Sequence, residues 1–227
     1  MEAMTVSQAV VARRSIRAFD SRPVDPALLR EVLDKACLAP SGGNLQPWHA
    51  TVLSGKRLDL LRQETLAAML KGRDGVETPE YQIYPSDLPD PWRSRRGSNG
   101  EAMYAALGIG REDKAARMAA VARNFDFFGA PVGLLLHTPH WMGKPQWADL
   151  GMWLQTLMLL LVEAGLGSCA QEAWSTYPET VKRVADIPPD HIFFCGLAIG
   201  YPDPAAPINS FPNPRAPLDE IVRFLDN

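Results

Sequence analysis

The sequence predicts a single domain of the α/β or α+β class. With 227 residues, 46% of them hydrophobic, the chain is long enough to bury one well-filled core. Two apolar runs, 132–137 and 192–199, suit buried strands, and segments with apolar residues at helical spacing precede them. No linker separates two parts of the chain, so we expect one domain over residues 1–227.

Local signals in the N-terminal part predict helices and one short strand. Apolar residues recur at helical spacing over 5–14, 26–39 and 56–70, and the β-prone run covers 49–53. The second of these helices has the clearest start. Asp25 is a suitable N-cap, and Pro26 favours the first helical position because its missing N–H is not needed there.

Residues 72–100 differ from their surroundings because they are rich in proline, glycine and charge. A structureless loop of this length is uncommon inside a domain unless it has a function. The segment carries Tyr81, Tyr84 and Trp92, and large aromatic residues are scarce in disordered segments. We therefore expect a lid-like excursion that overhangs a ligand site, with a disordered surface insertion as the alternative.

The second half of the chain is predicted to alternate helices with the two buried strands. The expected helices cover 100–107, 111–128, 147–164, 178–184 and 218–225. Helix 147–164 is apolar on nearly every side, so it belongs in the core or in a large subunit interface. The proline-rich tail 203–217 should run extended over the surface or over a partner.

Charge and composition exclude several classes of function. The net charge of −3 argues against general nucleic-acid or anionic-membrane binding, and the run 157–162 is too short to span a membrane. No secretory signal is visible, and the three cysteines form no Cys-x-x-Cys pair, which indicates reduced thiols in a cytoplasmic protein. His137 and His140 have no third ligand nearby, so no metal site is expected.

The run 13–17 (Arg-Arg-Ser-Ile-Arg) is the first candidate binding motif. Arg13, Arg14 and Arg17 suit phosphate oxygens because each planar guanidinium donates two parallel hydrogen bonds. Ser15 adds a neutral donor. The alternative is a solvated basic patch at the end of the first helix, where cations also complement the helix dipole.

The run 40–48 (Pro-Ser-Gly-Gly-Asn-Leu-Gln-Pro-Trp) is the second candidate motif and should form a loop between a helix and a strand. Its small residues allow the backbone to adopt unusual angles and to approach a flat polar ligand closely. An ordinary connecting loop is the alternative, because a glycine pair alone is a weak signal.

Together these motifs resemble the nitroreductase family of flavin enzymes. The similarity continues through 165–168 (Gly-Leu-Gly-Ser), 196–202 (Gly-Leu-Ala-Ile-Gly-Tyr-Pro) and Arg215 before a final acidic helix, in the family's order. The resemblance implies an α+β fold with a mixed sheet of about five strands flanked by helices. It also implies an intertwined homodimer with a flavin site at each side of the interface, in which the C-terminal tail lends a strand to the partner.

The resemblance assigns the phosphate of FMN to a set of basic and polar residues. Those that match the family's phosphate ligands are Arg13, Ser15 and Arg215, with Arg14 and Asn213 nearby.

Other residues are assigned to the flavin ring by the same resemblance. Arg17 corresponds to the cation beside the pyrimidine edge, and either Arg123 or Asn124 to a further polar contact. Glu172 and Ala173 would pass their backbone behind the ring, where the Ala173 amide could donate to N5. The residues that the other subunit would contribute are Pro40, Ser41, Gly42 and Asn44.

The resemblance implies an oxidoreductase in which the flavin performs the chemistry and the protein positions it. NADH or NADPH would give a hydride to the flavin, and a nitroaromatic compound or a quinone would then be reduced in ping-pong order. Arg17 would stabilise the negative charge of the reduced ring. A small aromatic acceptor would stack on the ring under Tyr81, Tyr84 or Trp92.

Two other functions stay open at this point. One is a different flavin enzyme of the same fold, such as a reductive dehalogenase or a flavin-fragmenting enzyme. The other is a non-catalytic protein whose arginine cluster binds a phosphorylated ligand.

Overall fold

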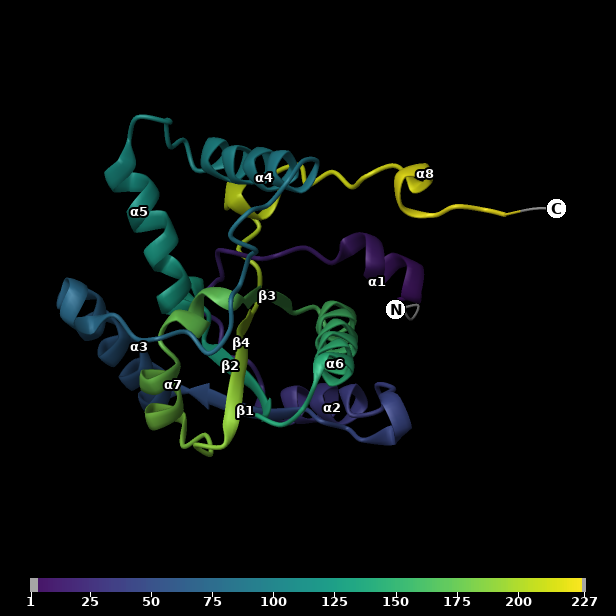
Figure 1. Cartoon of the computed structure of the whole chain (residues 1–227), viewed down its shortest axis with the longest axis horizontal. Coiled ribbons are helices and arrows are strands. Elements are labelled where there is room, and N and C mark those ends of the chain that lie inside the picture. Colours follow the sequence, from purple (N-terminus) through teal and green to yellow (C-terminus); the bar gives the residue numbers. More distant parts are fainter. Residues whose placement is uncertain (1–3, 226–227) are drawn as a thin grey trace.

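A four-stranded sheet forms the central layer of the protein, as seen in the computed structural model, which describes residues 4–225 (Figure 1). The strands are β1 (His49–Ser54), β2 (Val132–Pro139), β3 (Gly167–Gln171) and β4 (His191–Gly200). They are ordered β1-β2-β4-β3, and each neighbouring pair is antiparallel. The longest strands, β2 and β4, are therefore the central ones, where both faces of the sheet are covered.

Helices cover both faces of this sheet. The helices of the described chain are α1 (Val6–Ala12), α2 (Pro26–Ala36), α3 (Gly55–Leu70), α4 (Trp92–Ala106), α5 (Lys114–Ala122), α6 (Lys144–Glu163), α7 (Pro178–Ala185) and α8 (Leu218–Ile221), of which four pack on the sheet. Figure 1 shows α2 and α6 on one side of the sheet and α3 and α7 on the other. Among the described residues, no helix is both long enough and apolar enough to cross a membrane.

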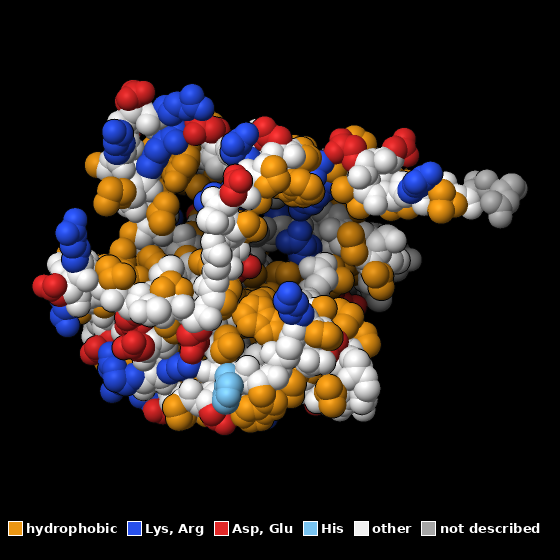
Figure 2. Space-filling view, viewed as in Figure 1, with side chains coloured by type: hydrophobic (Ala, Val, Ile, Leu, Met, Phe, Trp, Pro, Cys, Tyr) orange, Lys and Arg blue, Asp and Glu red, His pale blue; other side chains and the backbone are white. Residues whose placement is uncertain are grey.

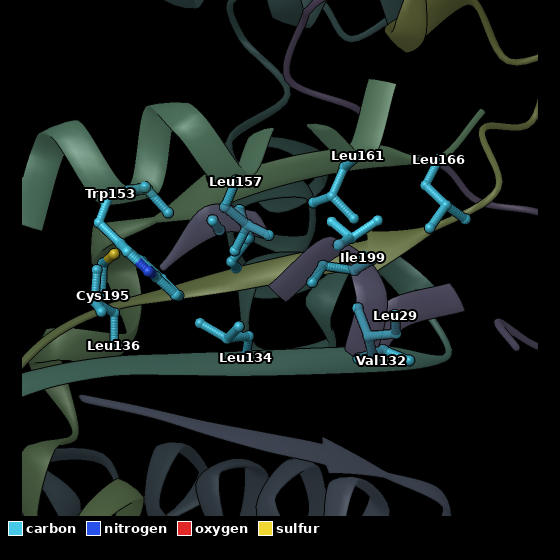
Figure 3. Close-up of a cluster of buried hydrophobic side chains, with 14 of the residues drawn as sticks. Leu29, Val132, Leu134, Leu136, Trp153, Leu157, Leu161, Leu166, Cys195 and Ile199 are labelled. Atoms are coloured by element: carbon cyan, nitrogen blue, oxygen red, sulfur yellow. The ribbon is translucent and has the colours of Figure 1, made fainter. Parts of the chain in front are cut away.

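Alternate residues of the central strands fill two separate cores. On one face, Leu134 and Leu136 of β2 meet Trp153, Leu157 and Leu161 of α6 (Figure 3). On the other face, Leu135, which lies between these two leucines in β2, packs with residues of α3 and α7. Each fully buried leucine contributes roughly 1.5–3 kcal/mol relative to an exposed one. The two-sided burial explains why 132–137 and 192–199 read as continuous apolar runs.

The α+β class is confirmed, whereas the sheet differs in detail from the mixed, five-stranded one that the resemblance implied. Within the described chain it has four strands, all antiparallel, and its parallel component is one bridge between Ser15 and Ser168. There the Ile16 N–H donates to the Ser168 carbonyl at 2.9 Å. Gly167 permits this approach, because a Cβ on it would lie 2.7 Å from the Ile16 side chain.

The segment 72–100 is more ordered than a loop. A 3-10 turn, η2 (Gly72–Gly75), is followed by an irregular stretch, and α4 begins at Trp92 rather than at residue 100. The Asp90 carboxylate favours this earlier start because it accepts the Ser94 N–H at 3.1 Å. The stretch itself is fixed to the body by two carboxylates. Glu77 accepts the N–H of Glu179 at 2.7 Å at the start of α7, and Glu80 accepts the N–H of Phe193 at 2.8 Å.

The C-terminal helix predicted over 218–225 is wrong in its length. The structure has only the single turn α8, and then a tail that extends away from the body (Figure 1). None of the α8 residues is buried. Isolated helices of this length are unstable without packing, so the acidic residues at its start cannot extend it.

Three histidines from three strands meet at one end of the sheet. The Nδ1 atoms of His137 and His191 lie 2.8 Å apart, and the His49 ring stacks on the His137 ring at 5.7 Å. His137 is only 5% exposed. Burial, followed by the charges of His191, His49 and Lys182, lowers the pKa of His137 to about 4 from 6.5. No three His, Cys, Asp or Glu side chains of the described chain are arranged to hold a metal.

This cluster predicts a loss of stability in mild acid. The unfolded chain takes up a proton at His137 near pH 6.5 and the folded chain only near pH 4. The neutral His137 ring therefore contributes fully to the free energy of unfolding above pH 6.5, and this contribution falls toward pH 4. We expect His137→Gln to reduce the fall in unfolding free energy between pH 7 and pH 5 by about 1 kcal/mol, after allowance for solvent screening. Urea unfolding at both pH values measures this. The exposed His140→Gln is the control, and an unchanged pH dependence in His137→Gln would contradict the assignment.

Candidate functional site

Six of the residues predicted to bind a cofactor line one cavity of about 400 Å³. They are Arg13, Arg14, Ser15, Arg17, Asn213 and Arg215. Figure 2 shows basic side chains inside the hollow between the α4 side of the molecule and the sheet. Residues from the two ends of the chain are thus brought together. A larger cavity of about 900 Å³, between α4 and the tail, shares Asn213 and Arg215 but is lined by no other predicted ligand.

The end of α1 and the edge of the sheet position the basic residues. Thr5 caps α1 reciprocally with Gln8, and the helix ends where the Arg13 N–H donates to the Ala9 carbonyl at 2.9 Å. Beyond Arg13 the chain turns extended and meets β3 through the bridge between Ser15 and Ser168. The first arginines and Ser15 therefore lie on a short segment that is fixed at both of its ends.

Asn209, which the sequence did not single out, joins this segment to the C-terminal tail. Its Oδ1 accepts the Arg17 N–H at 2.8 Å and the Ala18 N–H at 3.2 Å, and its Nδ2 donates to the Ala18 carbonyl at 2.8 Å. The Arg14 guanidinium donates to the Asn209 carbonyl at 3.0 Å. No local pattern could reveal this role, because the partners lie about 190 residues apart in the chain.

The cavity is strongly positive. In the part of the chain that the structure describes, no ion pair involves Arg13, Arg14, Arg17 or Arg215. Burial and then the Arg215 charge lower the pKa of Arg13, as expected where like charges gather. An anion with several oxygens, such as a phosphate ester, would satisfy these donors.

A second cavity of about 350 Å³ adjoins the first at Arg17. Apolar residues line most of it, chiefly from α4, α5 and the connection between them, and both Arg123 and Asn124 line it as well. The Arg123 guanidinium donates to the Phe128 carbonyl at 3.1 Å, and Gln171 donates to the Asn124 carbonyl at 2.7 Å. A flat ring that extends from the basic cavity would meet amide and guanidinium groups here.

Glu172 and Ala173 lie in η4 (Glu172–Thr176), which directly follows the edge strand β3. The hydroxyls of Ser175 and Thr176 donate to the Glu172 and Ala173 carbonyls at 2.7 and 2.8 Å, which fixes the course of this backbone. Burial raises the pKa of the Glu172 carboxyl.

The loop that holds Pro40, Ser41, Gly42 and Asn44 lies apart from the basic cavity, between α2 and β1. Its 3-10 turn η1 (Gly42–Asn44) lies against α6, where the Gly42 N–H donates to Asp149 Oδ1 at 3.2 Å. One chain therefore does not bring this loop to its own basic residues.

The three predicted substrate aromatics occupy different environments. Tyr81 is fixed to the body, because its hydroxyl donates to the Phe194 carbonyl and its ring packs edge-on against Trp147 at 5.1 Å. Burial raises the pKa of Tyr81. Tyr84 and Trp92 are 47% and 55% exposed, and the Arg96 guanidinium lies over one face of the Tyr84 ring, 4.2 Å from its centroid.

Comparison with known proteins places the whole arrangement in one family. The nitroreductase family model matches residues 10–201. The chain is 35% identical to 4-nitrobenzoate reductase of Pseudomonas putida, over 95% of this chain and 93% of that protein. The structure of an FMN- and NADPH-dependent nitroreductase, NfnB of sphigopyxis sp. strain HMH, is 52% identical with a TM-score of 0.96, over 99% of this chain and all of that one.

A second solved structure extends this similarity to a more distant relative. It is the FMN-dependent nitroreductase NfnB of Mycobacterium smegmatis in complex with NADPH, which is 32% identical with a TM-score of 0.91, over 98% of this chain and all of that one. The matches cover the basic segment, the loop, the sheet and the central helix in one continuous span. The chain belongs to the nitroreductase family.

Proposed function

We propose that this protein is an FMN-dependent oxidoreductase that uses NAD(P)H to reduce nitroaromatic compounds. The observation that carries the proposal is the cavity lined by Ser15 and four arginines, none of which pairs with a carboxylate within residues 4–225. Relatives that cover nearly the whole chain, among them a 4-nitrobenzoate reductase and an FMN- and NADPH-dependent nitroreductase, support the assignment of cofactor and substrate class.

The proposed phosphate ligands are Arg13, Ser15 and Arg215, because these side chains can approach one anion from two ends of the chain. Arg14 and Asn213 lie beside them and complete the rim of the cavity. Guanidinium groups can each donate two parallel hydrogen bonds to a phosphate monoester, and several of them can share its oxygens.

Arg17 is the proposed neighbour of the flavin's pyrimidine edge, because it lines both the basic and the apolar cavity. Arg123 or Asn124 would add a polar contact there, and Glu172 with Ala173 would carry their backbone behind the ring. Bound FMN would supply hydride chemistry, accepting a hydride from NAD(P)H and passing it to the nitroaromatic acceptor in ping-pong order.

The protein is proposed to act as a homodimer. The α6 face with Ala148, Gly151, Met152 and Gln155 is exposed in the single chain, although it is rich in apolar and small residues. The tail beyond α8 exposes Phe224 and other apolar side chains far from the body. A second copy would cover both surfaces, and it would bring its loop with Ser41, Gly42 and Asn44 to the flavin of its partner.

The domain is proposed to be single, with the segment 72–100 as a cover of the acceptor site; residues 1–3 and 226–227 lie outside the described residues. Tyr81 would support this cover, while Tyr84 and Trp92 would contact the acceptor.

Arg215→Ala tests the phosphate assignment. Loss of one charged hydrogen-bond partner should weaken FMN binding by about 1.5–3 kcal/mol, which is roughly a tenfold to hundredfold rise in Kd. Riboflavin lacks the phosphate, so its Kd should stay nearly constant. Quenching of flavin fluorescence measures both, with the exposed Arg30→Ala as the control. Unchanged FMN affinity would show that the phosphate binds elsewhere.

Arg17→Gln separates tuning of the flavin from retention of the flavin. A cation at the pyrimidine edge stabilises the more negative reduced form, so its removal should lower the reduction potential of the bound flavin and slow its reduction by NADPH. Flavin content should stay near that of the unmodified protein. Spectroelectrochemical titration gives the potential, and an unaltered value would place Arg17 away from the ring.

Sedimentation tests the proposed homodimer. We expect a dimer at the lowest concentration that absorbance detection allows, since the site needs residues of two chains. A folded, FMN-loaded monomer under these conditions would refute the proposal.

Truncation of Tyr84 or Trp92 to alanine tests the proposed cover. The ranking of several nitroarenes and a quinone by kcat/KM should change by about 1 kcal/mol, the contribution of one aromatic pair, while flavin content stays constant. A uniform loss over all acceptors would mean that the segment is a structural insertion.

A further inference from the structure

The loop 41–46 has a backbone that few sequences adopt. Gly43, Asn44 and Gln46 all have positive φ, at 58°, 56° and 50°. Positive φ is readily reached by glycine but is unfavourable for a residue such as glutamine. A loop of this shape keeps one conformation only if its surroundings determine it.

Most hydrogen bonds of the loop join its own residues. Ser41 Oγ accepts the Gln46 N–H at 2.9 Å, and the Gln46 side chain donates to the Asn44 carbonyl at 3.1 Å. These bonds hold the loop in shape but do not orient it on the protein. Orientation needs contacts with other elements.

Helix α6 supplies such contacts at the start of the loop and just beyond it. At the start, Asp149 Oδ1 accepts the Gly42 N–H at 3.2 Å. Two residues after the loop, the Trp48 ring stacks on the Trp153 ring with centroids 6.4 Å apart and planes inclined by 21°. Asp149 and Trp153 are separated by one helical turn, so one face of α6 carries both contacts.

Asp149 is an unusual residue for its place. It is only 4% exposed, and it stands on the face of α6 whose other members are Leu150, Trp153 and Leu157. Within the described chain, its Oδ2 has no hydrogen-bond partner. A Cβ placed on Gly42 would lie 4.0 Å from this Oδ2, so the carboxylate lies directly beneath the loop.

A buried carboxylate that accepts a single hydrogen bond does not increase the stability of the folded chain. Removal of a charged or polar group from water is unfavourable unless several hydrogen bonds compensate it, and an apolar residue of similar volume is often as stable or more so. The apolar neighbours of Asp149 would accept a leucine. The hydrogen bond to Gly42 is the interaction that a leucine would remove.

We propose that Asp149 is a positioning residue for flavin binding, which fixes the Gly42 peptide and thereby directs Ser41 and Asn44 toward the flavin of the partner subunit. The proposal rests on the proposed function. It also links two roles of α6. The exposed face of this helix would form the dimer interface, and its buried face holds the loop that would reach across the interface.

The test compares the rate at which FMN leaves the loaded protein in three variants. Asp149→Leu removes the acceptor, and FMN should then dissociate at least tenfold faster. Asp149→Asn keeps an oxygen in place for the Gly42 N–H, and its rate should stay within twofold of the unmodified protein. Leu157→Val alters the core two turns further along the helix. It should lower the unfolding temperature without changing the rate.

A ligand comparison separates the loop from the phosphate site. Asp149→Leu should weaken the binding of FMN and of riboflavin by the same factor, because the loop is proposed to contact the part of the flavin that both share, whereas Arg215→Ala should weaken the binding of FMN alone. Equal FMN release from Asp149→Leu and the unmodified protein, or equally fast release from Leu157→Val, would overturn the proposal while the proposed function stands. An unmodified protein that binds no FMN would overturn both.

Discussion

Mutual repulsion among guanidinium groups is the constraint on which the site depends. Arg13, Arg14, Arg17 and Arg215 line one cavity, and within residues 4–225 no carboxylate pairs with any of them. Such a cluster destabilises the folded chain unless an anion binds among the side chains. The fold therefore has to hold the two ends of the chain together, and a phosphate ester in the cavity would convert repulsion into stabilisation.

The surrounding structure counters this repulsion with hydrogen bonds to the backbone of the segment rather than with carboxylates that pair with the arginines. The segment after α1 forms a β-bridge to β3. The Asn209 side chain joins this segment to the tail, because it accepts one hydrogen bond from its backbone and donates another to it. Neutral groups fix the arginines without neutralising them, so the positive charge stays available to a ligand. Arg17 is placed by the same contacts at the border of the apolar cavity, which couples the proposed phosphate site to the proposed ring site.

The sequence was informative where the site and the fold depend on residues that are close together in the chain. The run 13–17 carries three arginines within five positions, and the apolar runs of β2 and β4 follow from burial on both faces. Interactions that join distant residues were missed, because no local pattern encodes them. Asn209 contacts Arg17 across 192 residues, and Asp149 contacts Gly42 across 107. The histidine cluster depends on the register of three strands. The final helix was predicted too long. Its acidic start can be recognised from neighbouring residues, whereas the packing that would stabilise a longer helix depends on distant residues and is missing.

The basic cavity is proposed to serve a redox flavin that works with NADH or NADPH and a nitroaromatic acceptor. Anaerobic titration of the purified protein with NADPH, and separately with NADH, followed by addition of 4-nitrobenzoate, tests this proposal. A flavin band in the visible spectrum should disappear with at least one of the two nucleotides and, once the nucleotide has been consumed, return when the acceptor is added. A colourless protein, or a flavin band that neither nucleotide changes, would refute the proposal.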